Sequence, residues 1–284
     1  MESTTTGKAP GSRLLTYITA ALFALIGAIL FFAPHWAAAN FAWEISPFVA
    51  MTMGGWYLGS AAMAYEAARI WRWPAIHGTL IFTWAFGLTE GLLLIIHRDV
   101  LRFDTALGIP YTLILAVASL NGLLGIAGYL RERPARQAEG LPSPWWARVM
   151  FVGFVLYVSL LVVLLADGIA PDGKIWPGPL SLLTARAFGA FFGSLVLGGL
   201  PLIFARGMAP IESFVRPGLV LSAIIEIAAL FFLGQFDFVN KPGGLIYHIS
   251  YGASIVAALI LVVYGYLARR RPRTSMPLSA GGAS

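Results

Sequence analysis

Four ionisable side chains interrupt long apolar stretches of this sequence: Glu90, Arg186, Glu226 and His248. An ionisable group inside a bilayer costs about 3 kcal/mol or more, so each is a candidate ligand- or ion-binding residue. Counting residues along each stretch puts all four in the outer half of the membrane. We therefore expect them to line one polar pocket that is open to the outer face.

Two arrangements of these groups are consistent with the sequence. A rise of about 1.5 Å per residue places Arg186 about 10 Å and Glu226 about 14 Å below the outer edge, close enough for a buried structural ion pair. Alternatively, Arg186 binds an anionic group while Glu226 and His248 bind a proton or a cation. Glu90 has no cationic partner in its own half of the chain, so we expect it to be protonated or to share Arg186.

The other polar residues show no familiar catalytic or metal-binding pattern. The remaining histidines are scattered: His97 lies with Arg98 at an expected solvated rim, His77 at the inner interface and His35 in an outer loop. The chain has no cysteine, and no HExxH motif, nucleotide-binding loop or hydrolase motif occurs. We assign no catalytic residue and no metal ligand, and the cofactor stays unknown.

The elements that carry these residues are expected to be membrane-spanning helices. The chain is 58% hydrophobic and 11% charged, whereas soluble domains are roughly 25% charged. Eight stretches are long and apolar enough for a helix of about 20 residues to cross the bilayer. They cover residues 14–33, 47–68, 75–97, 107–130, 146–166, 180–205, 217–235 and 244–268.

The basic residues predict the orientation of these helices. With the N-terminus inside, the inner segments hold fourteen Lys and Arg residues and the outer loops hold four. This bias predicts that both termini are cytoplasmic, and it argues against a nucleic-acid-binding surface as the reason for the net charge of +6. Arg outnumbers Lys sixteen to three, which suggests a bacterial protein of the inner membrane. Lys8, Arg13 and residues 37–39 resemble a secretory signal, but we expect a retained helix because 146–166 is its counterpart.

An internal duplication is the clearest pattern in the chain. Characteristic residues of the first half recur in the same order in the second half, each about 135 residues later. A nearly constant offset of this kind indicates an internal repeat. The matches include Ala33-Pro34 with Ala170-Pro171, Glu90 with Glu226, and Tyr111 with Tyr247, and they place Thr52 opposite Arg186 and Thr112 opposite His248. We expect two parallel four-helix repeats, 13–130 and 146–271, joined by a basic linker at 131–145, with disordered tails at 1–12 and 272–284.

Paired GxxxG motifs recur within this duplication, at Gly55 and Gly59 and again at Gly189 and Gly193. Glycines four residues apart allow close helix approach in lipid, so we expect the same packing contact in each half. The contact could also lie between subunits of a homo-oligomer.

Three functions stay open at this point. The first is binding or transport of a small solute or ion in the outward-facing pocket, and the second is a structural or assembly subunit of a membrane complex. The third is a haem-binding or other membrane redox enzyme. Two parallel four-helix halves resemble haem A synthase in architecture, which would imply haem ligation by histidines. Only His248 stands in a compatible position, however, and the cysteine pair of many members is absent.

Overall fold

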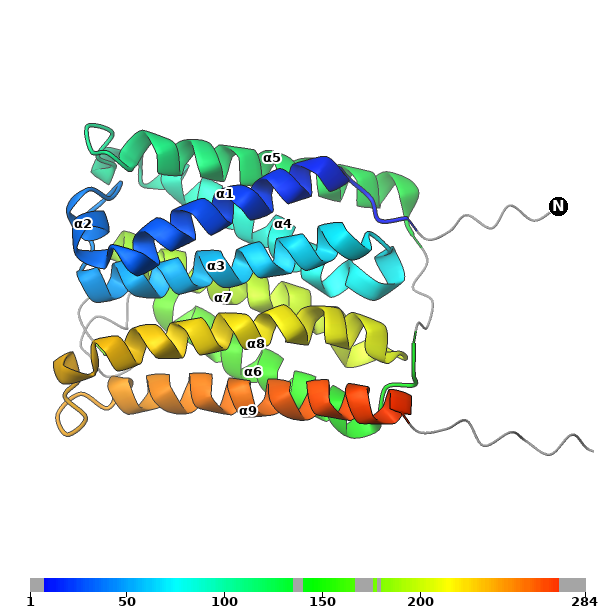
Figure 1. The fold of residues 1–284 in the computed structure, drawn as a ribbon. Helices are drawn as coiled ribbons and strands as arrows, with labels where there is room; N and C mark the ends of the chain where they lie inside the picture. The colour runs from blue at the N-terminus through cyan, green and yellow to red at the C-terminus, as the bar shows by residue number, and fades with distance from the viewer. Residues whose placement is uncertain (1–7, 135–139, 167–175, 178–179, 271–284) are drawn as a thin grey trace, which may run out of the picture.

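The computed structural model describes residues 8–134, 140–166, 176–177 and 180–270. Within these residues, eight long helices run side by side in one bundle (Figure 1). They are α1 (Arg13–Phe32), α3 (Pro47–Ile70), α4 (Trp73–Ile96), α5 (Gly108–Glu132), α6 (Trp145–Ala166), α7 (Leu182–Gly199), α8 (Met208–Phe231) and α9 (Gly243–Arg270). The short helix α2 (Pro34–Ala39) and three 3₁₀ turns, η1 (Arg98–Val100), η2 (Leu200–Phe204) and η3 (Leu233–Gln235), lie between them.

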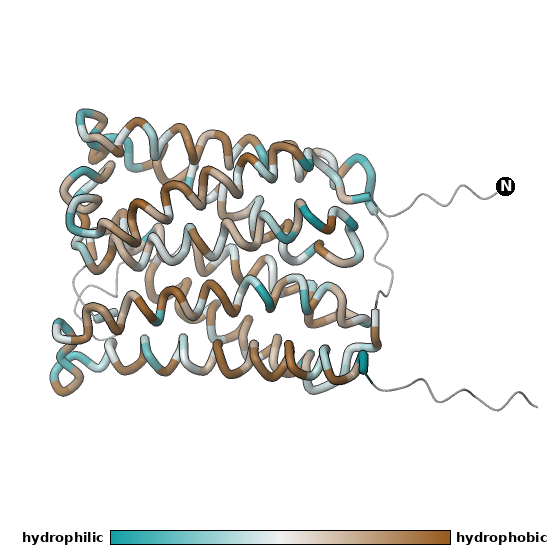
Figure 2. Tube along the Cα trace, viewed as in Figure 1, coloured by the Kyte–Doolittle hydropathy of each residue, from teal (hydrophilic) through white to brown (hydrophobic). Residues whose placement is uncertain are grey.

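Seven of these helices are long and apolar enough to cross a membrane. Figure 2 shows that hydrophobic residues dominate the middle of the bundle, while hydrophilic residues gather toward its two ends. This distribution is that of a multi-pass membrane protein, because a bilayer exposes an apolar band between two polar faces.

Helix α3 is long enough but is not among the seven apolar helices. It carries three glycines together with Thr52, Ser60, Glu66 and Arg69, which lower its hydropathy. Most of its side chains are buried against α1 and α8, so they face protein rather than lipid. Because α3 runs alongside its neighbours along the bundle (Figure 1), it follows the same path as the apolar helices.

Local sequence signals begin several of the helices. Ser12, Ser46 and Ser181 are N-caps whose side chains accept hydrogen bonds from backbone N–H groups three residues later. These bonds satisfy donors that the first turn of a helix leaves free. Residues 8–12, expected in a disordered tail, instead pack on the bundle: Lys8 pairs with Arg72 in a β-bridge, and Ala9 is buried.

The predicted start of the seventh span, residue 217, is wrong. Helix α8 begins nine residues earlier, at Met208, and Pro217 lies inside it. Proline removes one backbone hydrogen bond, but membrane helices tolerate it where neighbouring groups compensate. Glu212 and Arg216 lie in the connector expected before residue 217, yet both belong to the helix, where they form an ion pair of 2.9 Å.

The two halves of the chain pack through matched helix pairs. Helix α3 packs on α8, and its predicted counterpart α7 packs on α4. Helices α4 and α5 likewise pack together, as do α8 and α9. The duplication stays a prediction, which this pairing supports. Two pairs differ. Helix α3 packs against α4, whereas α7 and α8 do not pack closely. Helix α1 packs against α5, whereas α6 and α9 meet at local contacts, Trp146 with Tyr264 and Tyr157 with Ser250, and a cavity lies between them.

Only one of the two GxxxG motifs has the expected close contact along its length. A Cβ added at Gly59 would lie 2.8 Å from the Leu221 Cα atom on α8, and one at Gly55 would lie 3.0 Å from Ile225. A Cβ added at Gly193 would meet nothing within 4 Å, and Gly189 is buried. Instead, α7 approaches α4 through Gly198 and Gly78, where each added Cβ would lie under 3 Å from the other residue's carbonyl oxygen.

Both ends of the described chain lie at the same end of the bundle. Helix α1 begins there and α9 ends there (Figure 1). The start of α6 lies there too, since Ser143 donates a backbone hydrogen bond to Arg206. This agrees with an even number of crossings, while the cytoplasmic side stays a prediction. The predicted match at Ala170-Pro171, most of the tails, and Arg136 in the linker fall outside the described residues.

Candidate functional site

Glu226 and His248 form a close pair between α8 and α9. His248 Nδ1 lies 2.6 Å from Glu226 Oε1. The His248 side chain is 17% exposed and the Glu226 side chain is 20% exposed. The other two polar atoms, Glu226 Oε2 and His248 Nε2, are buried and have no hydrogen-bond partner among the described residues. The pair therefore has unused hydrogen-bonding capacity on both partners.

The expected ion pair between Arg186 and Glu226 does not form. Arg186 Nη1 lies 3.1 Å from His97 Nε2, so it joins α7 to the end of α4. Counting residues gave the depth of each group but not the direction in which its helix presents it. For the same reason His97, expected at a solvated rim, is half-buried in this contact.

The His97–Arg186 contact favours neutral histidine. Arg186 donates, so His97 Nε2 must be the unprotonated acceptor. Partial burial, and next the positive charge of Arg186, lower the pKa of His97 below its ordinary value of 6.5.

Glu90 is fully enclosed in the first half of the bundle. It is 2% exposed, and its Oε1 atom has no hydrogen-bond partner among the described residues. No hydrogen bond to Arg186 is found within that part of the chain. Two buried hydroxyls also lie in this half, where Tyr57 and Tyr111 are joined by a 2.6 Å hydrogen bond. A carboxyl group buried in this way without a cation is costly, so Glu90 is a conspicuous feature of this half.

The four predicted residues therefore do not form one cluster. Glu226 and His248 make one pair, Arg186 has a partner outside the predicted set, and Glu90 stands apart. The described residues contain no group of three or more His, Asp or Glu side chains that could hold a metal ion.

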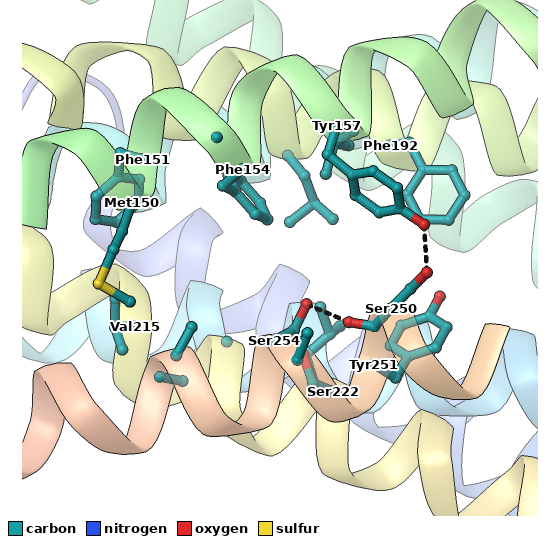
Figure 3. A pocket seen from close by; sticks show the side chains of 18 of the residues that line it. Met150, Phe151, Phe154, Tyr157, Phe192, Val215, Ser222, Ser250, Tyr251 and Ser254 are labelled. Carbon is teal, nitrogen blue, oxygen red and sulfur yellow. Dashed lines mark hydrogen bonds between the residues drawn. The ribbon is translucent and has the colours of Figure 1, made fainter. Parts of the chain in front are cut away.

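A cavity that contains none of these residues lies between α6 and α9 (Figure 3). Its volume is about 560 Å³, within the range of roughly 300–1,000 Å³ that is usual for small-molecule sites. Helices α7 and α8 form its floor with Phe192, Leu195, Phe214 and Leu221. The lining residues include no charged side chain and none of Glu90, Arg186, Glu226 or His248.

A few hydroxyl groups interrupt this apolar lining. Figure 3 shows Tyr157, Ser250 and Tyr251 toward one end of the cavity and Met150, Phe151 and Val215 toward the other. The Ser250 hydroxyl contacts the Tyr157 hydroxyl across the gap between α6 and α9. The cavity is therefore apolar over most of its length and polar at one place, a combination that is common in small-molecule pockets.

Sequence reasoning missed this cavity because its lining is hidden in ordinary apolar spans. One signal was present: small side chains recur along one face of α9 at Ser250, Ser254, Ala257 and Ala258. Such a stripe is usually explained by helix packing. Here these small residues of α9 face the cavity and leave space between α9 and α6.

A second missed feature is an ionic cluster where α9 ends. Buried Glu212 on α8 accepts hydrogen bonds from Arg216, at 2.9 Å, and from Arg269 on α9. The glycine at position 265 makes room for this carboxylate, since an added Cβ would lie 2.5 Å from Glu212 Oε1. The cluster ties α8 to α9 beyond one end of the cavity.

No protein family, curated protein or solved structure matches this chain. The site is therefore interpreted from its own geometry.

Proposed function

We propose that this multi-pass membrane protein binds a lipid-like molecule, which enters from the bilayer into the cavity between α6 and α9. The observation that supports this most is an apolar cavity that lies between two helices of the bundle's surface. The gap between α6 and α9 gives a lateral entrance, because Gly153 on α6 and Ala253 on α9 line the cavity and are also exposed.

The dimensions of the cavity fit one hydrocarbon chain. Its lining runs along α9 from Ile246 to Leu261, which corresponds to about 22 Å at a rise of about 1.5 Å per residue. A volume of about 560 Å³ spread over that length leaves a narrow channel. Apolar side chains beside an unfilled space lose dispersion contacts, so a chain that fills the channel stabilises the fold.

Photolabelling in lipid nanodiscs tests this proposal. A long-chain hydrocarbon probe with a diazirine in its tail should label peptides from α6 and α9 that line the cavity. The substitution Ala257→Trp places a large side chain inside the cavity and should reduce this labelling at least about fivefold, as loss of most of the binding space implies. The matched control is Val256→Trp on the neighbouring residue, which is 57% exposed and should change little.

A second variant keeps the test informative even if Ala257→Trp fails to fold. A Cβ at Gly153 would meet nothing within 4 Å, so Gly153→Leu should fold normally while it narrows the cavity from α6. Labelling of the cavity peptides that is equal in wild type, Ala257→Trp and Gly153→Leu would reject the proposal.

A second candidate is binding or transport of a small solute or ion by the polar residues of the outer half. The buried, unpartnered atoms Glu226 Oε2 and His248 Nε2 favour it, since such atoms are otherwise costly. Arg186 and Glu90 would contribute to it only through separate contacts. In the arrangement expected from the sequence, Arg186 binds an anionic group of the solute. A folded Arg186→Leu variant that still binds or takes up the solute fully would contradict this role of Arg186.

We further propose that the protein resides in a bacterial plasma membrane with both termini in the cytoplasm. The support is the bias of Lys and Arg toward one set of connectors. In this orientation, the hydroxyl-bearing end of the cavity is nearer to the outer leaflet, because Ile246 is close to the outer end of α9.

A further inference from the structure

The Tyr251 hydroxyl is a buried polar group without a hydrogen-bond partner in the wall of the α6–α9 cavity. The side chain is 8% exposed, and no described residue makes a hydrogen bond of acceptable geometry with its oxygen. A buried hydroxyl left unpaired costs about 1–3 kcal/mol. Such a group in a binding cavity indicates a partner that the ligand supplies.

The neighbouring hydroxyls differ because the protein itself satisfies them. Ser250 donates to the Ile246 carbonyl at 2.5 Å, and Ser254 donates to the Ser250 carbonyl at 2.8 Å. Since the Ser250 proton is used in this way, the Tyr157 hydroxyl is the donor in its contact with Ser250 Oγ. Figure 3 shows the Tyr157–Ser250 and Ser254–Ser250 bonds beside the Tyr251 hydroxyl, which has none.

Trp56 on α3 lies behind Tyr251. Its indole N–H lies close to the Tyr251 oxygen but does not form a hydrogen bond of acceptable geometry, and it has no other acceptor among the described residues. Phe191 stacks on the Trp56 ring at 4.4 Å and Phe188 packs against its edge, so the indole is held in place. Because an indole offers a donor and no acceptor, Trp56 cannot take the Tyr251 proton, which is left to be donated into the cavity.

The remaining lining restricts the charge of the ligand. None of the described lining residues is cationic or anionic, and an ionised group placed there without a counter-charge would lose its hydration. We propose that the ligand is an uncharged amphiphile whose ester or ketone oxygen accepts a hydrogen bond from Tyr251. Its hydrocarbon tail extends toward Met150 and Val215. This assignment rests on the proposed function.

The physics of the bilayer gives the polar contact its importance. Lipid tails are as apolar as leucine, so moving a tail from the membrane into the cavity brings little hydrophobic gain. The hydrogen bond to Tyr251, in contrast, is made in surroundings without water, where the unbound state leaves the hydroxyl unpaired. Selection among amphiphiles therefore depends on the oxygen rather than on the chain.

Competition against the photoprobe in nanodiscs tests this assignment. The competitors are a long-chain methyl ester, the alkane of the same length and the corresponding fatty-acid carboxylate. With the wild-type protein, the ester should compete about three- to tenfold better than either of the others, as expected for one net hydrogen bond. In Tyr251→Phe, which removes only the hydroxyl, the ester should fall to the level of the alkane while the alkane is unchanged.

The matched control is Tyr266→Phe, at an exposed position of the same helix, which should leave the preference for the ester intact. Equal competition by ester and alkane in the wild type, or an unchanged preference in Tyr251→Phe, would overturn the assignment of the oxygen acceptor. Strongest competition by the carboxylate would overturn the uncharged ligand. In these cases labelling of the cavity peptides still falls in Ala257→Trp and Gly153→Leu, whereas failure of the proposed function itself appears as labelling that is absent or is equal in wild type and both variants.

Discussion

His97 and Arg186 illustrate how far single residues follow from the sequence. Both were recognisable as polar groups near the outer end of the membrane, but their pairing was not. Residue counting gives the depth of a side chain, whereas partners depend on the rotation of each helix about its axis and on which helices touch. Glu226 and His248 were likewise expected in one region, yet only the contact of α8 with α9 determines that they bond to each other.

The His97–Arg186 contact predicts a pH-dependent stability. The pKa of His97 is lowered in the folded protein by burial and by Arg186, so the unfolded chain binds this proton more readily. The contribution of the contact is therefore complete above about pH 6.5 and is lost as the pH falls below that value. In detergent, His97→Gln, which keeps an acceptor but does not titrate, should lose less thermal stability than wild type between pH 7.5 and pH 5.

Other groups also titrate between pH 5 and pH 7.5. The test is therefore the difference in thermal stability between wild type and His97→Gln, not the stability loss of either protein alone. An identical loss of melting temperature in wild type and His97→Gln would show that the contact does not depend on the proton of His97.

Helix boundaries were the most predictable feature among the elements. Apolar length and flanking polar residues predicted most ends to within a few residues, since the bilayer fixes the length of a span. The inner end of α8 failed because Pro217 and Arg216 looked like a helix start. Glu212, in the first two turns, pairs both with Arg216 on α8 and with Arg269 on α9, and the second contact could not be predicted from the sequence.

The two GxxxG motifs predict opposite responses to the same substitution. At Gly59, an added methyl group would overlap the Leu221 side chain and approach its Cα atom to 2.8 Å. Gly59→Ala should therefore separate α3 from α8 and destabilise the protein by about 1–3 kcal/mol, as overpacking does. Gly193→Ala meets open space and should be neutral or slightly stabilising, because alanine favours helix over glycine.

Thermal unfolding of the two variants in the same detergent measures this difference. If Gly193→Ala were as destabilising as Gly59→Ala, both motifs would be in close contacts, as the duplication first suggested. Equal tolerance of both substitutions would mean that α3 and α8 are not closely packed at Gly59.

The whole molecule departs from its predicted symmetry most clearly at the cavity between α6 and α9. The number of long helices, their order and the matched pairs α3–α8 and α7–α4 agree with a duplicated four-helix unit. Helices α1 and α5 pack together, and the Thr16 hydroxyl on α1 donates a hydrogen bond to Asn121 Oδ1 on α5 at 3.2 Å. Helices α6 and α9 meet at local contacts, and the cavity lies between them. A sequence pattern could not predict this difference, because small residues on α9 fit a tight contact and an open channel equally well.

The central claim is that a lipid-like molecule occupies the α6–α9 cavity. Its most direct test is the mass of the intact protein released from its own membrane by native mass spectrometry. The account predicts one bound hydrophobic molecule in wild type and in Val256→Trp, and its loss in Ala257→Trp and in Gly153→Leu. A wild-type protein that carries no such molecule, or carries it equally in all four forms, would contradict the account.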